Sequence, residues 1–408
     1  MILRPYNAET DRDATRRIWL ELGWLRDGDD LDSFDRLVAA NRSLVGELDG
    51  AAECLVQSAR GTLRYLDADV PLASVCAVTT SHLARQGGLA SRLVARLIAE
   101  DALAGAAVQC LGMFDQGFYD RLGFGTGSMD IYTRFDPGAL TVPRDFRPPK
   151  RLTAEQGPEA HALRIARRRG HGAVTLTDAA HTTEGWFSRK DHLAYGWYDG
   201  ERLTHFLHGR MKERWHGPLE LSGLVWSEPA QVIEMLAFLR SLSDQVYSVE
   251  LVEHPAVQIQ DLLSRPARSE GSRSKSQFET GYGGHVWWQM RMNDVPACVA
   301  ACRGVGATVR FNARLTDPVV DYLPEGCGWP GAGGEYVVSL GDESAAERGH
   351  DPALPTLEAT INAFTRLWLG VRPASGLAIT DRLSAPAALL AELDQALRMP
   401  SPRPDWDL

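Results

Sequence analysis

This sequence has few cysteines, no long apolar run and no excess of basic residues. Its six cysteines show no Cys-x-x-Cys spacing, and several lie in apolar, strand-like runs where buried, reduced thiols are expected. This pattern predicts a cytoplasmic protein without a metal site. No apolar run approaches the ~18 residues that a membrane-spanning helix needs. The first residues, Met1-Ile2-Leu3-Arg4-Pro5, do not resemble a signal peptide, so we expect no membrane partner.

The charge balance argues against a second class of partner. The chain has 43 basic and 53 acidic residues, which gives a formal net charge of −10. Domains that bind nucleic acid are basic, so nucleic acid is not expected to be the main partner. An acidic protein attracts cationic small molecules instead. The length of 408 residues predicts about two to four domains.

One stretch combines a strand, a glycine turn and a helix. Residues 75–80 are apolar and β-branched, which predicts a buried strand, and residues 89–98 carry leucine and isoleucine at helical spacing. The first amides of a helix have no partner within it, and the dipole makes that end positive, so the junction attracts anions. Gly87 and Gly88 allow the backbone to approach a phosphate closely. The turn lacks the Lys-Ser/Thr ending of a nucleotide triphosphate loop and the three-glycine dinucleotide fingerprint.

Two motifs resemble those of the GNAT superfamily of N-acetyltransferases. Arg85-x-x-Gly88-x-Ala90 is similar to its pyrophosphate loop, and Phe118-Tyr119, followed after three residues by Gly123-Phe124, is similar to a second signature. The resemblance implies acetyl-CoA as acyl donor and Tyr119 as the general acid that protonates the departing thiolate. A tyrosine packed in the core is the alternative interpretation of Tyr119.

The rest of the chain divides into further blocks. The alternating run at 129–135 predicts a strand that closes the first domain, and the prolines at 137–149 place a boundary near residue 140. A second block has strands and a helix at 230–242. Its preceding turn ends in Glu228-Pro229 instead of glycines, and proline has no N–H while glutamate repels phosphate, so no CoA site is expected there. A third block begins near Gly284 and includes the segment Trp287-Trp288-Gln289-Met290-Arg291-Met292-Asn293-Asp294-Val295-Pro296.

The three blocks in this order resemble the enhanced intracellular survival family of aminoglycoside-modifying acetyltransferases. The resemblance implies an α+β chain of two tandem GNAT-type α/β domains, the second without a CoA site, followed by a sterol-carrier-protein-like α/β domain. The implied bounds are 1–140, 141–283 and 284–408. Members of this family assemble as hexamers, so a homo-oligomer is expected.

The family also implies which residues form the site. The base would be the C-terminal carboxylate of Leu408 threaded back into the first domain, although chain ends are often frayed, and a frayed end is the alternative. The residues that would contact acetyl-CoA are Val78, Thr79, Thr80, Arg85, Gln86, Gly87, Gly88, Leu89, Ala90, Ser91, Phe114 and Asp115.

A loop near the N-terminus is a candidate for substrate binding. Trp24 and Asp27 stand in a segment with several carboxylates, and carboxylates together with an aromatic face can hold a cationic amine. A solvated loop is the alternative. The predicted function is acetyl-CoA-dependent N-acetylation of a primary amine on a cationic small molecule, for example an aminoglycoside-like one. The competing hypothesis is a carrier of an apolar ligand whose GNAT domain is not catalytic.

Overall fold

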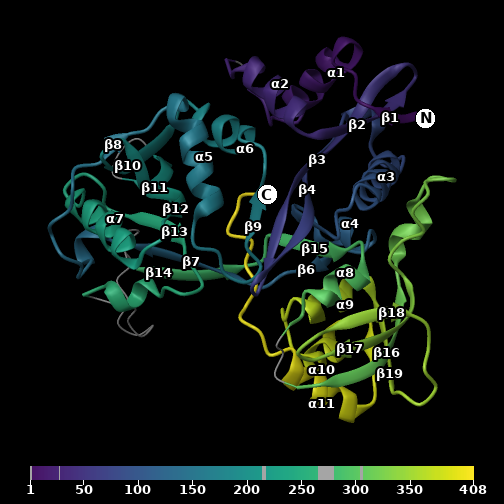
Figure 1. Cartoon of the computed structure of the whole chain (residues 1–408). Helices are drawn as coiled ribbons and strands as arrows, with labels where there is room; N and C mark the ends of the chain where they lie inside the picture. The colour runs from purple at the N-terminus through teal and green to yellow at the C-terminus, as the bar shows by residue number, and fades with distance from the viewer. Residues whose placement is uncertain (1, 27, 214–216, 265–279, 304–306) are drawn as a thin grey trace, which may run out of the picture. The chain divides into compact units, whose positions relative to one another are not determined.

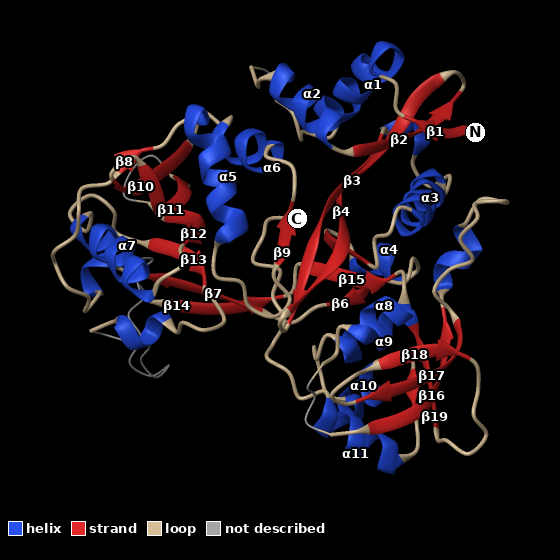
Figure 2. Ribbon diagram, in the orientation of Figure 1, coloured by secondary structure: helices blue, strands red, loops and turns tan. Residues whose placement is uncertain are grey.

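The computed structural model describes residues 2–26, 28–213, 217–264, 280–303 and 307–408. In these residues it shows a mixed α/β fold with sheets of eight, seven and five strands (Figures 1 and 2). The chain divides into two compact units. One comprises Met1–Ser128, Gly170–Asp178 and Val286–Leu408, and the other comprises Met129–Arg169 and Ala179–His285.

The first sheet has the order β1-β2-β3-β4-β5-β15-β6, and β9 also pairs with β3. Its neighbours are antiparallel except β4 and β5, which are parallel and are connected through α3 (Leu89–Leu103), as a parallel pair requires a crossover. The strands are β1 (Ile2–Pro5), β2 (Arg42–Leu48), β3 (Ala51–Tyr65), β4 (Ala68–Thr80), β5 (Val108–Gly112), β6 (Gly125–Thr126), β9 (Val174–Leu176) and β15 (Trp288–Met292).

The predicted helix after the glycine turn is confirmed. Helix α3 buries the leucines and the isoleucine that carried the prediction, Leu89, Leu93, Leu97 and Ile98, so helical periodicity and burial agree. The other helices of this part of the unit are α1 (Ala8–Glu21), α2 (Leu31–Ala40), the 3₁₀ turn η1 (His82–Ala84) and α4 (Gln116–Asp120).

The predicted strand at 129–135 is confirmed, but the expectation that it closes the first domain is wrong. Its residues form β7 (Asp130–Phe135), which pairs with strands of the second unit, and β15 takes the place between β5 and β6 instead. All five residues of β15 are buried, whereas β7 mixes buried, half-buried and exposed positions. A strand buried along its whole length fits an interior position of the sheet, and the two polar residues of β15, Gln289 and Arg291, are buried with partners, Asp120 and Asp317.

The second unit's sheet has the order β14-β7-β13-β12-β11-β10-β8. The parallel pair β12 and β13 is connected by α7 (Pro229–Ser241), and all other neighbours are antiparallel. Counted from β8, the order of antiparallel and parallel strand pairs is the same as in the first sheet counted from β1. The remaining bounds are β8 (Lys150–Arg151), α5 (Gly157–Ala166), α6 (Ala180–Thr182), β10 (His192–Asp199), β11 (Arg202–Met211), β12 (Leu219–Val225), β13 (Val249–Val252) and β14 (Gly281–His285).

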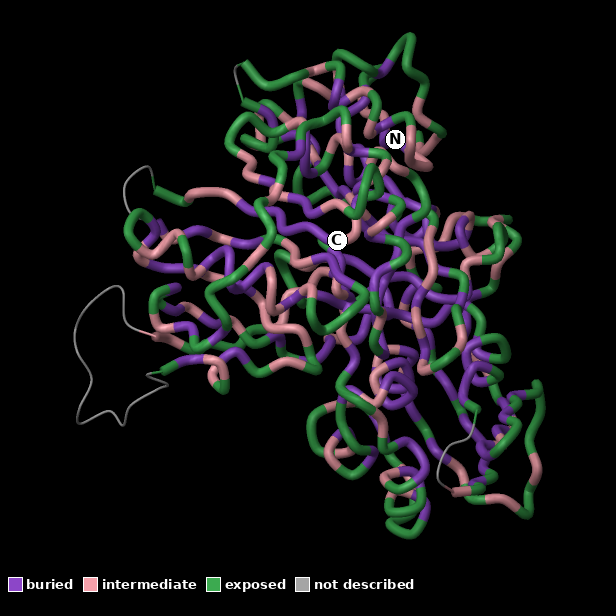
Figure 3. The backbone as a smooth tube through the Cα atoms, turned by 60° about the vertical axis from the view of Figure 1, so that its left-hand side comes forward, coloured by how far each residue is buried: buried purple, intermediate pink, exposed green. Residues whose placement is uncertain are grey.

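The third sheet belongs to the first unit and has the order β18-β17-β16-β19-β20. One apolar cluster joins β15 to this block and includes Trp288, Met290, Phe311 and Trp368. Figure 3 shows the buried segments in purple. The bounds are α8 (Val295–Ala300), β16 (Val309–Thr316), η7 (Pro318–Tyr322), β17 (Gly334–Leu340), β18 (Ala345–Arg348), β19 (Thr356–Thr360), α9 (Ile361–Trp368), α10 (Ala374–Thr380), β20 (Leu383–Ser384) and α11 (Ala387–Ala396).

Two kinds of feature are absent from the part of the chain that the structure describes. None of its helices is long and apolar enough to cross a bilayer. Within the same residues, no group of three or more His, Cys, Asp or Glu side chains is arranged to hold a metal ion.

Candidate active site

The first sheet opens between β4 and β5. Their pairing runs from Leu72 opposite Val108 to Val75 opposite Leu111 and then stops. Strand β4 continues to Thr80, paired on its other edge with β3, and Cys76 is an extra, bulged residue in that pairing. A bulge bends its strand and disrupts the ladder locally. Beyond Val75, one edge of β4 therefore has no strand partner among the described residues, and an extended ligand can bond to it.

The predicted strand residues of the CoA site lie on this open stretch. Val78 and Thr79 are buried, and the Thr79 hydroxyl donates to the Leu55 carbonyl at 3.4 Å. Thr80 is half-buried, with its hydroxyl 3.3 Å from the Cys54 sulfur. Since both threonine hydroxyls contact β3, the open edge presents mainly backbone groups.

The glycine turn has the geometry of an anion cradle. Gln86 and Gly88 have φ values of +66° and +72°, and Gly88 is the N-cap of α3, with no side-chain cap and no acidic residue in the first turn. Residues 85–88 are exposed. In the described part of the chain, the amides of Gly88, Leu89, Ala90 and Ser91 donate no hydrogen bond to protein. These amides lie at the positive end of the helix dipole, where a phosphate could accept from them; Gly88 is exposed, whereas Leu89 and Ser91 are buried.

Two arginines flank the turn. Arg85 precedes the glycines and is exposed, and Arg92 is exposed one helical turn after Gly88, whose carbonyl accepts from the Arg92 amide at 3.2 Å. Neither forms an ion pair among the described residues. Arg92 was not predicted from the sequence, although its spacing of four residues from Gly88 places both on one helix face.

Tyr119 is buried in an aromatic cluster. Its side chain is 2% exposed, and Phe114, Phe118 and Phe124 approach it edge-on, with ring centroids 5.8, 4.9 and 6.0 Å away. Burial raises the pKa of the phenol well above its usual value, and the charge of Asp115 adds to this. The phenol therefore keeps its proton at neutral pH.

The remaining predicted CoA residues follow β5 directly. Asp115 is the N-cap of α4, and its carboxylate accepts from the Phe118 amide at 3.2 Å. Phe114 is 70% exposed, although it is aromatic. An exposed ring beside the open edge offers an apolar surface to a bound thioester carrier.

The end of the chain lies at the end of β5. A Cβ on Gly112 would lie 2.7 Å from the Leu408 carbonyl oxygen. The tail before it is held in place: the Arg403 amide donates to the His171 carbonyl at 3.0 Å, and the Val174 amide donates to the Pro404 carbonyl at 2.6 Å. The C-terminus thus lies where β4 and β5 part, and it is tied to the fold.

Cys76 is a second neighbour of the tail that the sequence did not single out. Burial raises the pKa of its thiol to about 12, and the charges of Asp101 and Asp407 add to the effect. Asp407 therefore lies close enough to the bulge to act on it electrostatically.

The predicted amine-binding loop is only partly described. Trp24 is 48% exposed and packs edge-on against Trp19, with ring centroids 5.2 Å apart, and Asp27 lies outside the described residues. A carboxylate missed from the sequence lies nearby, at the end of α1. Glu21 accepts from the His82 amide at 2.5 Å and lies 2.8 Å from His82 Nδ1, which joins α1 to η1.

The corresponding turn of the second unit is closed. The amides of Ser227 and Glu228 both donate to the Gln231 side-chain oxygen, at 2.8 and 3.0 Å, and Pro229 follows as the first residue of α7. A proline has no N–H to offer. Fewer amides are therefore left without an acceptor at this helix start than at the start of α3, among the residues that the structure describes.

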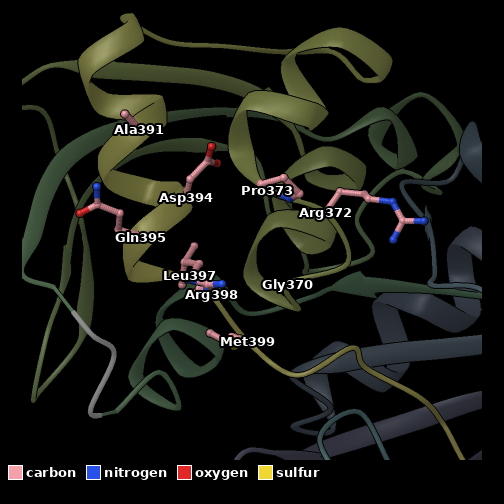
Figure 4. A pocket seen from close by; sticks show the side chains of 9 residues that line it. All are labelled: Gly370, Arg372, Pro373, Ala391, Asp394, Gln395, Leu397, Arg398 and Met399. Carbon is pink, nitrogen blue, oxygen red and sulfur yellow. The ribbon is translucent and has the colours of Figure 1, made fainter. Parts of the chain in front are cut away.

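A surface hollow of about 650 Å³ lies in the third block (Figure 4). Its lining includes Arg372, Asp394 and Arg398, and Asp394 accepts from both the amide and the hydroxyl of Ser375, at 3.0 and 2.6 Å. Charged side chains are costly in an apolar cavity. This hollow therefore gives no support to an apolar-ligand carrier.

The family comparison agrees with this geometry. Residues 9–127 match the family model described as an acetyltransferase (GNAT) domain, a range that contains the open strand, the glycine turn and α4. The protein is an N-acetyltransferase. GNAT acetyltransferases use acetyl-CoA as their acyl donor. No curated protein matches the sequence.

Solved structures share the fold over the whole chain. The GCN5-related N-acetyltransferase from Anabaena variabilis superposes with a TM-score of 0.78 at 15% identity, over 100% of both chains. The GCN5-related N-acetyltransferase from Kribbella flavida superposes with a TM-score of 0.76 at 18% identity, over 100% of this chain and 98% of its own. Eis1 from Mycobacterium abscessus superposes with a TM-score of 0.75 at 17% identity and 100% coverage of both chains. At these identities the likeness shows a mixed α/β GNAT-type fold.

Proposed function

We propose that the protein transfers the acetyl group of acetyl-CoA to a primary amine of a cationic small molecule, for example an aminoglycoside-like one. The observation that carries the proposal is the turn at 85–91, whose amides from Gly88 to Ser91 donate to no acceptor in the described residues and lie beside the parted strands. The pyrophosphate of acetyl-CoA would bind these amides, with Arg85 and Arg92 adding positive charge. The pantetheine arm would run along the open edge at 78–80 and past Phe114.

The reaction needs a base for the amine. An amine attacks a thioester only when neutral, and a free amine is mostly protonated at pH 7. The carboxylate of Leu408 would accept that proton, since a terminal carboxyl has a reference pKa of about 3.5 and is ionised. Its position beside Gly112 supports this role. The amine nitrogen then forms the new bond to the acetyl carbon, and the carbon–sulfur bond breaks.

The departing thiolate needs a proton. Tyr119 would supply it and recover a proton from water. Its raised pKa keeps the phenol protonated. Burial in the same cleft also makes a thiolate more basic, as the thiol of Cys76, with its pKa raised to about 12, illustrates.

The proposed architecture keeps the three predicted domains, 1–140, 141–283 and 284–408, except that β7 (Asp130–Phe135) belongs to the sheet of the second. The matching order of strand pairings in the first two sheets supports tandem GNAT-type domains, and the closed turn at Ser227 and Glu228 supports a second domain without a CoA site. A sterol-carrier-protein-like third domain, a hexameric assembly and a cytoplasmic location rest on the family resemblance and the sequence.

The amine would enter beside Trp24 and Asp27. The net charge of −10 favours a cation over an anion. An exposed indole ring packs well against a cationic sugar or polyamine chain.

Release of CoA from acetyl-CoA, measured with a thiol reagent, tests the proposal. The acceptors are a panel of aminoglycosides, polyamines and lysine peptides, with neutral sugars as the matched control. We expect release above the rate of hydrolysis with cationic amines and none with neutral sugars. Equal release with both classes would refute the cationic substrate, and the absence of release with every amine would refute the acetyltransfer itself.

A further inference from the structure

We propose that Asn362 is a positioning residue for Tyr119, so that the third block of the chain sets the place of the acid in the first. This inference rests on the proposed role of Tyr119. Asn362 is the second residue of α9. Its side-chain nitrogen donates to two backbone carbonyls, those of Asp120 and Phe124, each at 2.8 Å.

The two carbonyls lie at either end of the turn that follows α4: the Asp120 carbonyl also accepts from the Gly123 amide at 3.1 Å, and Phe124 lies four residues beyond the helix. α4 has five residues, from Gln116 to Asp120, and a helix leaves its last carbonyls without partners. So short a helix is not stable without tertiary contacts. Both acceptors are carbonyl oxygens, which only accept, so the Asn362 amide is oriented with its NH₂ toward them. Its two protons then tie the last residue of α4 to Phe124 in the turn that follows.

The link from Asn362 to Tyr119 runs through the backbone. The Tyr119 carbonyl accepts from the amides of Leu122 and Phe124, at 2.9 and 3.3 Å. Phe124 also packs against the Tyr119 ring. If the Phe124 carbonyl moves away from Asn362, we therefore expect the turn at 120–124 to move with it. The amides of Leu122 and Phe124 in this turn donate to the Tyr119 carbonyl, so Tyr119 should be displaced as well.

Other side chains that follow residue 286 support the same turn. Gln289 donates to the Asp120 carboxylate at 2.7 Å, and the Arg291 guanidinium donates to the Leu122 carbonyl. Arg291 is fully buried and paired with Asp317 at 2.8 Å. The end of α4 is thus held by residues from a part of the chain distant in sequence.

A double-mutant cycle tests the inference. Asn362→Leu keeps the approximate volume and removes both hydrogen bonds. We expect it to lower kcat by about tenfold to a hundredfold, because a displacement near 1 Å of a catalytic group costs that much, while the KM for acetyl-CoA changes less than twofold. In the Tyr119→Phe background, the same substitution should cause no further loss of kcat, because the group that it positions is already removed.

Asn312→Leu is the matched control. Asn312 also lies in the third block, and its amide nitrogen donates to two backbone carbonyls, those of Asp351 and Leu354, at 2.8 and 3.1 Å. Among the described residues, the side-chain hydrogen bonds of Asn312 stay within the third block and do not reach α4, so we expect lower thermal stability with kcat retained. An equal fall of kcat in both variants would overturn the positioning role.

Hydrogen exchange gives a readout that does not need activity. In Asn362→Leu the amides of Leu122 and Phe124 should exchange at least tenfold faster than in the wild type, and in Asn312→Leu they should not change. Unchanged exchange in Asn362→Leu, or a further loss of kcat when the substitution is added to Tyr119→Phe, would overturn the inference. Full activity of Tyr119→Phe alone would instead remove the proposed acid and would leave the exchange result to decide whether Asn362 holds α4.

Discussion

Replacing Gly112 with alanine adds one methyl group against the end of the chain. The new Cβ would lie 2.7 Å from the Leu408 carbonyl oxygen and 3.5 Å from a ring carbon of Trp287. Contacts without strain begin at about 3.4 Å, so the terminus must retreat by about 0.7 Å while the indole can stay. The backbone at Gly112 has no positive φ, so alanine itself introduces no backbone strain there. The substitution therefore acts mainly on the terminal carboxylate.

The expected result is a fall in kcat of about tenfold or more, because misplacing a catalytic group by about 1 Å costs up to a hundredfold. Steady-state CoA release measures kcat, and calorimetric titration with CoA should give an affinity close to that of the wild type. Gly185→Ala is the control, since a Cβ there meets nothing within 4 Å and its φ is ordinary.

A variant that lacks Leu408 shows whether Gly112→Ala acts through the contact between the new Cβ and Leu408 or in another way. With the terminal residue removed, kcat should already be low, and the alanine should lower it no further. Full activity of Gly112→Ala, or the same relative loss with and without Leu408, would refute the placement of the base at this position.

Three further outcomes follow from the site and the fold. Gly88→Ala forces a residue with a Cβ into the left-handed region, at a cost of roughly 1–2 kcal/mol, so the KM for acetyl-CoA should rise several-fold while the melting temperature falls only slightly; an unchanged KM would contradict binding at this turn. Tyr119→Phe should lower kcat at least tenfold. Because burial raises the pKa of Tyr119, ionisation of its phenol should not reduce the wild-type activity up to pH 10. A fall in wild-type activity near pH 9 that is absent in Tyr119→Phe would contradict this. Burial lowers the pKa of His205 to about 4, so the unfolded chain binds the proton more readily, and the free energy of unfolding should rise between pH 4 and 6.5 by up to about 3 kcal/mol. Urea titrations should show that His205→Gln flattens this rise, and an unchanged slope would refute the cause.

The local parts of the site could be predicted from the sequence because neighbours in the chain create them. The strand, the turn at Gly87 and Gly88 and the start of α3 follow from periodicity and backbone rules over about twenty residues. Phe118, Tyr119 and Gly123 form a motif of the same kind, and the structure places Tyr119 in a short helix. The roles of these residues remain proposals, while the shape of the segment is an observation.

The predictions that failed, and the residues that were missed, involve contacts with residues distant in sequence. The alternation at 129–135 predicts a strand correctly, but periodicity does not say which sheet receives it, and β15 fills the place instead. Cys76 became notable only because the pairing of β3 and β4 shifts there. Asn362 lies in an ordinary helix start, and nothing in its sequence surroundings points to α4.

These failures have a common physical cause, which also bears on how the enzyme works. The segment that carries the turn and Tyr119 does not complete its own sheet, because β15 comes from beyond residue 286 and lies between β5 and β6. The support of α4 by Asn362 and Gln289 and the carboxylate at Leu408 come from the same part of the chain. Since one continuous apolar cluster joins β15 to the third sheet, a disturbance of that core should reach the strand next to β5 before it reaches the glycine turn. Acetyl-CoA binding and the chemical step should therefore respond separately to changes in the third block, with kcat the more sensitive of the two.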